Sequence, residues 1–381
     1  MKVRLKRILG TGTVLVFGFY LLMGCGPAKQ EKQLVVRNPA DFDRTELASI
    51  PYQTFREHFP GNTAFRIIDP GSGKEVPYQL EKKGGDSIQN LLIWVSVRAN
   101  DSLLLKVMAG QPDSIAPKTF ARYVPERYDD FAWENDKIAF RMYGKALESR
   151  PDNAEGTDIW AKRTDKLIID KWYKEADYHK DHGEGLDYYN VGMTLGAGDI
   201  APVVDGKIVF SKHYRQHEVL DNGPLRSTFK LTYEPFQVNG QSVEVSKTIS
   251  LDAGSQLNRV EVVYKLEKED TLAVAAGIVL RKEEGQKISY PEAGITAYWE
   301  PAHGEDGHLG VAVLSKDPVR AVREVDGQLL TQYRASSGQP LVYYNGGVWD
   351  KAGEIKDAKA WRSYLKQFKM RLEQPLNVSI K

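Results

Sequence analysis

Residues 260–267, Val-Glu-Val-Val-Tyr-Lys-Leu-Glu, carry the pattern that decides the fold of this chain. Four side chains, Val260, Val262, Tyr264 and Leu266, alternate with a mostly polar set, Glu261, Val263, Lys265 and Glu267. Because strand side chains point alternately to opposite faces, this stretch predicts a half-buried strand with one wet face. We expect further strands at residues 137–142, 207–210, 211–219, 227–233, 242–251, 272–280, 310–314 and 341–344. So many strands with few helices predict an all-β, large antiparallel sandwich over residues 119–381.

Shorter strands precede this region. Apolar or alternating runs at residues 33–37, 65–68, 76–80, 91–97 and 102–107 are separated by turn-rich links. Residues 111–118 contain Pro112 and Pro117 and form the best boundary in the chain. We therefore predict a small N-terminal β-sandwich domain over residues 33–115.

One C-terminal helix is expected. Trp361, Tyr364, Leu365, Phe368 and Leu372 recur at helical spacing after Asp357, and Pro375 ends the run. An aromatic stripe of this kind is typical of a face that packs on the core.

The N-terminus resembles a secretory signal. Lys2, Arg4, Lys6 and Arg7 precede a largely apolar run at residues 8–22, and Leu22-Met23-Gly24-Cys25 closes the segment. The run is too short to favour a permanent membrane span. Cys25 is the only cysteine, and the ending is similar to the bacterial lipobox, whose cysteine is lipidated. We expect residues 1–25 to be a lipoprotein signal, residues 26–32 a tether, and the protein to be lipid-anchored in the cell envelope, at the periplasmic face or the outer-membrane surface. The alternative is a plain cleaved signal with an incidental cysteine.

Charge and motifs exclude several classes. The chain has 52 basic and 51 acidic residues, a net charge of +1 that gives no reason to expect nucleic acid as a partner. A membrane contact is expected through the lipid anchor only. No nucleophile-elbow, phosphate-loop or dinucleotide fingerprint is present in the sequence, which disfavours serine hydrolases, nucleotidases and Rossmann oxidoreductases. The 19 tyrosines and 7 tryptophans are compatible with sugar binding, but by themselves they favour ordinary use in strands.

Candidate functional residues gather between residues 160 and 217, in a stretch rich in polar groups, aromatics and glycine. His182 and Glu184 are candidate acid and base, and Tyr188 can act as a base if a cation lowers its pKa. Arg163 and Arg215 are candidates for binding a substrate carboxylate. The remaining candidates are Asp187 and Asp129 for catalysis and Trp160, Lys162, Lys171, Tyr189 and His213 for substrate binding. The alternative is an ordered surface loop. If residues 211–219 form a strand, His213, Arg215 and His217 share one face, which lines a groove or faces water.

No cofactor is expected. The spacing of His179 and His182 matches no recognised zinc pattern, and no second cysteine exists. A structural calcium ion held by Asp129, Asp130 or Glu134 remains an open alternative.

Several blocks together resemble a known family. They are residues 128–141, 158–163, 168–173, 250–259, 290–294 and, the most specific, 179–188, His-Lys-Asp-His-Gly-Glu-Gly-Leu-Asp-Tyr. Over about residues 33–375, these blocks make the chain similar to domain-of-unknown-function family 4861, which is found largely in Bacteroidota. The resemblance implies a surface or periplasmic lipoprotein that accompanies polysaccharide utilisation, often of pectin-type or other uronic-acid-bearing glycans. It also implies that the large domain is similar to a galactose-mutarotase-like supersandwich.

The partner expected is therefore an oligosaccharide or polysaccharide. The first hypothesis is an enzyme acting on uronate-containing oligosaccharides. As a lyase it would use Arg163 or Arg215 with Tyr188 or His182; as a hydrolase it would pair Glu184 with Asp187 or Asp129. The alternatives are a non-catalytic glycan-binding lipoprotein and a mutarotase-like sugar epimerase using His182. Fold analogy alone does not decide among them.

Overall fold

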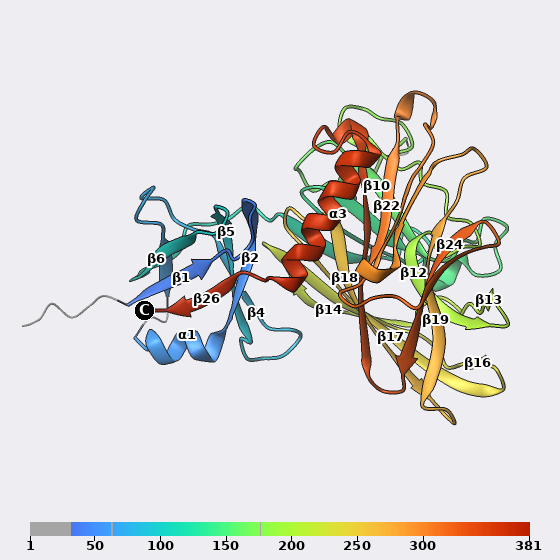
Figure 1. Cartoon of the computed structure of the whole chain (residues 1–381), viewed down its shortest axis with the longest axis horizontal. Helices are drawn as coiled ribbons and strands as arrows, with labels where there is room; N and C mark the ends of the chain where they lie inside the picture. Colours follow the sequence, from blue (N-terminus) through green and yellow to red (C-terminus); the bar gives the residue numbers. More distant parts are fainter. Residues whose placement is uncertain (1–31, 62–63, 176) are drawn as a thin grey trace, which may run out of the picture. The chain divides into compact units, whose positions relative to one another are not determined.

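The computed structural model describes residues 32–61, 64–175 and 177–381. Strands dominate these residues (Figure 1), which confirms the prediction of an all-β protein. Residues 1–31, with the expected signal, Cys25 and most of the tether, lie outside the described residues. No helix within the described residues is long and apolar enough to cross a membrane.

The N-terminal part is a sandwich of two antiparallel sheets. One has the order β26 (Asn377–Ile380), β1 (Gln33–Arg37), β6 (Ser102–Ala109), β3 (Phe65–Ile68), and the other β2 (Arg44–Pro51), β5 (Asn90–Val97), β4 (Tyr78–Glu81). Inward side chains such as Ile67, Ile93 and Leu105 fill the space between them. The last strand of the chain, β26, pairs with the first, β1, with Val36 opposite Val378. Both ends of the described chain are therefore tied into this sandwich.

The larger part is built on a nine-stranded antiparallel sheet. Its order is β14 (Gln216–Asn222), β15 (Arg226–Thr232), β17 (Gln241–Asp252), β18 (Leu257–Leu266), β25 (Pro340–Trp349), β22 (Leu309–Leu314), β21 (Ile295–Trp299), β20 (Gln286–Tyr290), with β16 (Phe236–Val238) paired to β17. In β18, Val260, Val262 and Tyr264 are buried between their more exposed neighbours. The alternation at residues 260–267 therefore predicted this strand correctly.

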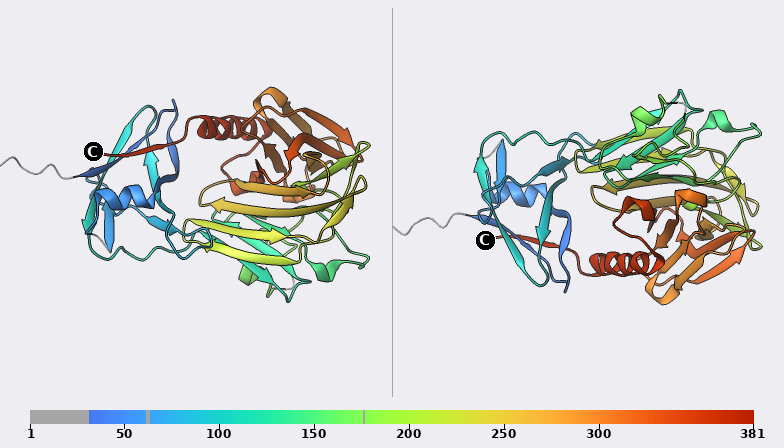
Figure 2. Two further views of the ribbon diagram at one scale, coloured as in Figure 1. Left: turned by 90° about the horizontal axis from the view of Figure 1, so that it is seen from below. Right: turned by 90° about the horizontal axis from the view of Figure 1, so that it is seen from above.

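Two five-stranded sheets pack with the nine-stranded sheet in one large core. They have the orders β11 (Gly185–Leu186), β10 (Thr157–Lys162), β9 (Ile138–Met142), β8 (Asp130–Asn135), β7 (Thr119–Val124), and β13 (Lys207–Ile208), β12 (Ala197–Val204), β19 (Thr271–Val279), β24 (Gln328–Ser336), β23 (Ala321–Val325). Val311 and Val313 of β22 face this core, whereas Ala312 and Leu314 face the other way. That opposite face is covered by α3 (Ala358–Glu373), through Trp361 and Leu365 (Figure 2).

The helix prediction was correct for α3 and incomplete elsewhere. The Asp357 side chain accepts a hydrogen bond from the Ala360 amide at 2.7 Å and so caps the helix where expected. The described residues also contain α1 (Tyr52–His58) and α2 (Ile169–Trp172). In α1 only Phe55 is buried. A helix of two turns with a single buried apolar side chain shows no apolar periodicity in its sequence.

The strand expected over residues 211–219 was wrong in its extent. The strand β14 begins at Gln216. Just before it, the Arg215 amide still donates to the carbonyl oxygen of Thr232, but the His213 amide donates to a side chain, Glu148 Oε1, at 3.0 Å. His213 and Arg215 therefore precede the strand that contains His217.

Candidate functional site

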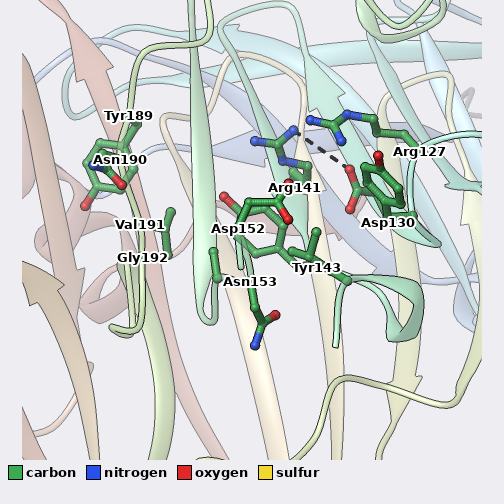
Figure 3. Close-up of a pocket in the computed structure, with 13 residues that line it drawn as sticks. Arg127, Asp130, Arg141, Tyr143, Asp152, Asn153, Tyr189, Asn190, Val191 and Gly192 are labelled. Atoms are coloured by element: carbon green, nitrogen blue, oxygen red, sulfur yellow. Dashed lines mark ion pairs between the residues drawn. The ribbon is translucent and has the colours of Figure 1, made fainter. Parts of the chain in front are cut away.

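A cavity of about 390 Å³ lies beside β8 and β9. Its lining comes from the turn before β8, from β9, from residues 147–154 and from the segment after β11 (Figure 3). Arg127 and Asp130 lie on one side of it, Asp152 in the middle, and Tyr189 and Asn190 on the other side. The residues around it are Arg127, Tyr128, Asp130, Arg141, Tyr143, Leu147, Asp152, Asn153, Ala154, Tyr189, Asn190, Val191 and Gly192. Its size is in the range of ligand-binding pockets, about 300–1,000 Å³.

The backbone at the rim of this cavity is strained. Tyr128 and Asp129 are consecutive non-glycine residues in the left-handed region, with φ of 53° and 62°. Asp129 is held there by two tyrosines, because Tyr123 donates to its Oδ1 at 2.5 Å and Tyr214 donates to its carbonyl oxygen. Strain of this kind persists where surrounding contacts over-determine the backbone, and it concentrates at functional sites.

Arg141 organises the charged floor of the cavity. Its guanidinium is buried and lies 2.5 Å from Asp158, 3.2 Å from Asp187 and 3.8 Å from Asp130. Three chain segments far apart in sequence thus converge on one cation. Sheet register explains part of this, since Arg141 in β9 is directly opposite Asp158 in β10.

Burial sets the protonation of these acids. It raises the pKa of Asp130 and of Asp158 to about 7, and it raises the pKa of Asp187 as well, although Arg141 pulls in the other direction. Asp152 behaves oppositely. The Arg150 side chain donates to both of its oxygens, at 2.9 and 3.1 Å, and lowers the pKa of Asp152. A carboxyl that keeps its proton near neutrality and one that is ionised therefore line the same cavity.

Arg127 is the cation at this cavity that has no carboxylate within 4 Å among the described residues. Its guanidinium stacks over Tyr128, 5.0 Å from the ring centroid, and its Nε donates a long 3.4 Å hydrogen bond to the Tyr178 hydroxyl. Arg141, by contrast, is already neutralised by its acids. Arg127 is thus the guanidinium that remains free to bind an anionic group.

A second cavity, of about 460 Å³, shares the segment Asn190–Gly192 with the first. Tyr188, Arg281, Glu300 and His303 line it. Arg281 donates to Glu300 at 2.7 Å, and burial raises the pKa of Glu300 to about 7 despite this partner.

The structure places some sequence candidates at these cavities. Tyr189 lines the first cavity, Asp187 contacts its floor through Arg141, and Asp129 lies in the chain between two lining residues, Tyr128 and Asp130. Tyr188 lines the second cavity. A tyrosine base required a cation that lowers its pKa, and this condition is not met, because burial raises the pKa of Tyr188 and of Tyr189 well above the usual value.

Other candidates lie in different surroundings, outside the lining of both cavities. Trp160 and Lys162 are fully buried, and Lys162 donates to Glu134 at 2.6 Å. Ion pairs at the partly exposed surface join Lys171 of α2 to Glu184 and Arg163 to Asp181, at 2.6 and 2.7 Å, and His182 contacts the carbonyl oxygen of Asp177. His213 contacts Asn153, and Arg215 pairs with Glu148. These side chains are occupied by partners within the protein, so only the sequence pattern supports a role for them in the site.

Sequence reasoning missed Arg127, Arg141, Tyr143 and Asp152. It had named Asp130 only as a calcium ligand. The signal that was available was the block at residues 128–141, which carries three of the lining residues, Tyr128, Asp130 and Arg141. The described residues hold no cluster of three metal-ligating side chains. Both Glu134 oxygens already accept hydrogen bonds: Oε2 from Lys162 and the Ile168 amide, and Oε1 from the amides of Ile168 and Ile169.

Comparisons with known proteins give one family. Residues 36–378 match the family described as Domain of unknown function (DUF4861), which confirms the resemblance seen in the sequence. "Uncharacterized protein P7" of Formosa agariphila is 32% identical over 389 residues, covering 94% of this chain and 96% of that protein.

Among solved structures, the chain is similar to a protein in glycosyl hydrolase family 38 from Enterococcus faecalis, with 10% identity and a TM-score of 0.46, over 93% of this chain and 48% of that one. It is also similar to an alpha-mannosidase from Enterococcus faecalis V583, with 10% identity and a TM-score of 0.43, over 92% and 46%. The chain spans about half the length of these two solved proteins.

Proposed function

Because the chain belongs to the DUF4861 family, whose description names no reaction, we propose a function from the first cavity itself: hydrolysis of a glycosidic bond in a uronate-bearing oligosaccharide. The observation that carries this proposal is the pair of carboxyls, Asp130 and Asp152, whose surroundings shift their pKa values in opposite directions at one cavity. Such a divergence is how a site separates its acid from its base.

Each carboxyl has a role that follows from its protonation. Asp130, whose pKa of about 7 leaves a substantial protonated fraction near neutral pH, donates its proton to the leaving glycosidic oxygen. Asp152, ionised, removes a proton from the attacking water or attacks the sugar carbon directly. The distance between the two carboxyls in the substrate complex decides which, about 6.5–9.5 Å for inversion and about 5–5.5 Å for retention.

Arg127 supports the choice of an acidic sugar. A planar guanidinium binds a carboxylate through two parallel hydrogen bonds. Arg127 has no carboxylate within 4 Å among the described residues, and it lines the cavity next to Asp130. A uronate carboxylate placed against it would bring the adjoining glycosidic bond to the acid.

Hydrolysis is favoured over β-elimination by the tyrosines. A lyase needs a base for the proton beside the uronate carboxylate, and a tyrosine serves only when its pKa is lowered. Desolvation raises the pKa of Tyr143 and of Tyr189, two of the tyrosines that line the cavity. The envelope location, with Cys25 as the lipid anchor, belongs to the same proposal and rests on residues 1–25 of the sequence.

The test is product analysis with the purified protein and a panel of neutral and uronate-bearing oligosaccharides, read by mass and by the absorbance of unsaturated uronates. Cleavage without new absorbance is expected. Asp130→Asn and Asp152→Asn should each lower kcat by about 10²–10⁴-fold, whereas Asp326→Asn, at an exposed hairpin turn, should leave it unchanged.

New absorbance would replace hydrolysis with β-elimination. Binding without cleavage would replace the enzyme with a glycan-binding protein. Full activity in Asp130→Asn would remove Asp130 from the mechanism.

A further inference from the structure

The second cavity adjoins the first along a shared wall. Asn190, Val191 and Gly192 line both. Arg281 fixes this wall from the side of the second cavity: its Nη1 donates to the carbonyl oxygen of Asn190 at 2.7 Å, and its guanidinium stacks over the Tyr189 ring at 4.5 Å. A ligand that fills the first cavity therefore has a pre-formed neighbouring pocket within reach of its next unit.

Tyr188 lines that pocket and carries an unsatisfied polar group. Its hydroxyl is buried and has no hydrogen-bond partner within the described part of the chain. A buried hydroxyl without a partner costs free energy, and native proteins rarely leave one unless a water or a ligand satisfies it. The Tyr188 ring stacks on His303, with centroids 4.9 Å apart and planes 21° from parallel, so the hydroxyl is held in place.

The other groups of the pocket suit a sugar. The side chain of His303 is 63% exposed and offers ring surface for the apolar face of a pyranose. Glu300 is 4% exposed and keeps acceptor capacity beyond its bond to Arg281. The lining charges balance in number, with Arg281 and Lys282 against Glu283 and Glu300. Arg281 is already paired with Glu300, so the pocket carries no net charge that would favour an acidic unit.

We infer that the second cavity is a subsite for an uncharged, hydroxyl-rich sugar unit, linked to the acidic unit in the first cavity. This inference rests on the proposed function. It makes the ligand a mixed oligosaccharide, with a uronate beside Arg127 and a neutral pyranose between Tyr188, Glu300 and His303.

The experiment compares two probes by titration calorimetry: glucuronic acid alone, and the disaccharide in which glucuronic acid is linked to xylose. The full protein carries Asp130→Asn throughout, so that the disaccharide is not consumed. We expect the disaccharide to bind more tightly than glucuronic acid. Tyr188→Phe and His303→Ala should each weaken disaccharide binding by roughly five- to tenfold and leave the affinity for glucuronic acid unchanged.

Both substitutions should fold. Tyr188→Phe removes a hydroxyl that has no partner within the described residues, and His303 is a surface residue. The matched controls are Tyr333→Phe, which removes another buried hydroxyl without a described partner, and His58→Ala on α1. Neither control should change binding of either probe.

The outcomes separate the two proposals. If glucuronic acid binds but the disaccharide binds no more tightly, or if the two variants bind it as well as the controls do, the subsite is refuted and the proposed function stands. If neither probe binds, the uronate preference fails, and the subsite falls with it.

Discussion

Replacing Lys162 by methionine should destabilise the protein strongly, because it leaves a buried charge without its partner. The ammonium of Lys162 donates to Glu134 Oε2 and to the carbonyl oxygen of Asn135, both at 2.6 Å, and both charged side chains are 0% exposed. Removing one member of a buried ion pair costs about 3–5 kcal/mol. Two backbone amides, those of Ile168 and Ile169, still donate to Glu134 in the variant. We therefore expect the lower end, about 3 kcal/mol, or about 100-fold in the unfolding equilibrium.

The assay is urea denaturation of Lys162→Met beside Lys287→Met. Lys287 forms a 2.5 Å ion pair with Glu324 on the surface, and its loss should leave stability unchanged within error. The double variant Lys162→Met, Glu134→Gln removes both charges and should recover at least half of the loss. The reasoning is refuted if Lys162→Met and Lys287→Met unfold at the same urea concentration. It is also refuted if the double variant loses as much free energy of unfolding as its two single variants lose together.

Three further predictions concern pH, packing and lipidation. Burial raises the pKa of four carboxyls to about 7: Asp130, Glu155, Asp158 and Glu300. Unfolded carboxyls titrate near 4, so between about pH 4 and 7 the folded state binds more protons than the unfolded state, and stability falls as pH rises. The lowered pKa values of His213 and His217 act in the opposite direction, but these are two groups against four. We therefore expect a lower thermal midpoint at pH 8 than at pH 5.5, and the reverse order would contradict the reasoning. Gly144→Ala would put a Cβ 1.8 Å from the carbonyl oxygen of Asp129, so it should lower the free energy of unfolding by about 1–3 kcal/mol and disturb the cavity rim. Gly61→Ala, with open space around it, should leave stability unchanged. Equal stability of the two variants would refute this. Cys25→Ser should abolish incorporation of labelled palmitate, and unchanged incorporation would disprove the lipid anchor.

Local patterns predicted much of the fold. The alternation in β18, the strands β5 and β17, and the capped helix α3 each follow from side chains within one stretch of chain. A strand or an amphipathic helix reveals itself through which of its own positions are apolar. Shorter elements such as α1 did not, since a single buried side chain makes no pattern.

The candidate site was predicted less well. Polar groups and glycines are dense at residues 160–217, and most candidates predicted from the sequence lie there. Several of them are instead paired at the surface, Lys171 with Glu184 and Arg163 with Asp181. The cavity instead draws Arg127 and Asp130 from one segment and Asp152 from another. Nothing in the spacing of these residues shows that they meet.

The sequence by itself determined the family, the all-β class and the positions of most strands, because alternation and capping are properties of neighbouring residues. Only the tertiary structure decided which acids surround Arg141, and which carboxyl is buried and which is exposed. Strand pairing joins residues that are distant in the chain, as β26 joins β1. A pKa depends on the solvent and charges that this pairing places around a group, so the chemistry of the cavity follows from the assembled sheets.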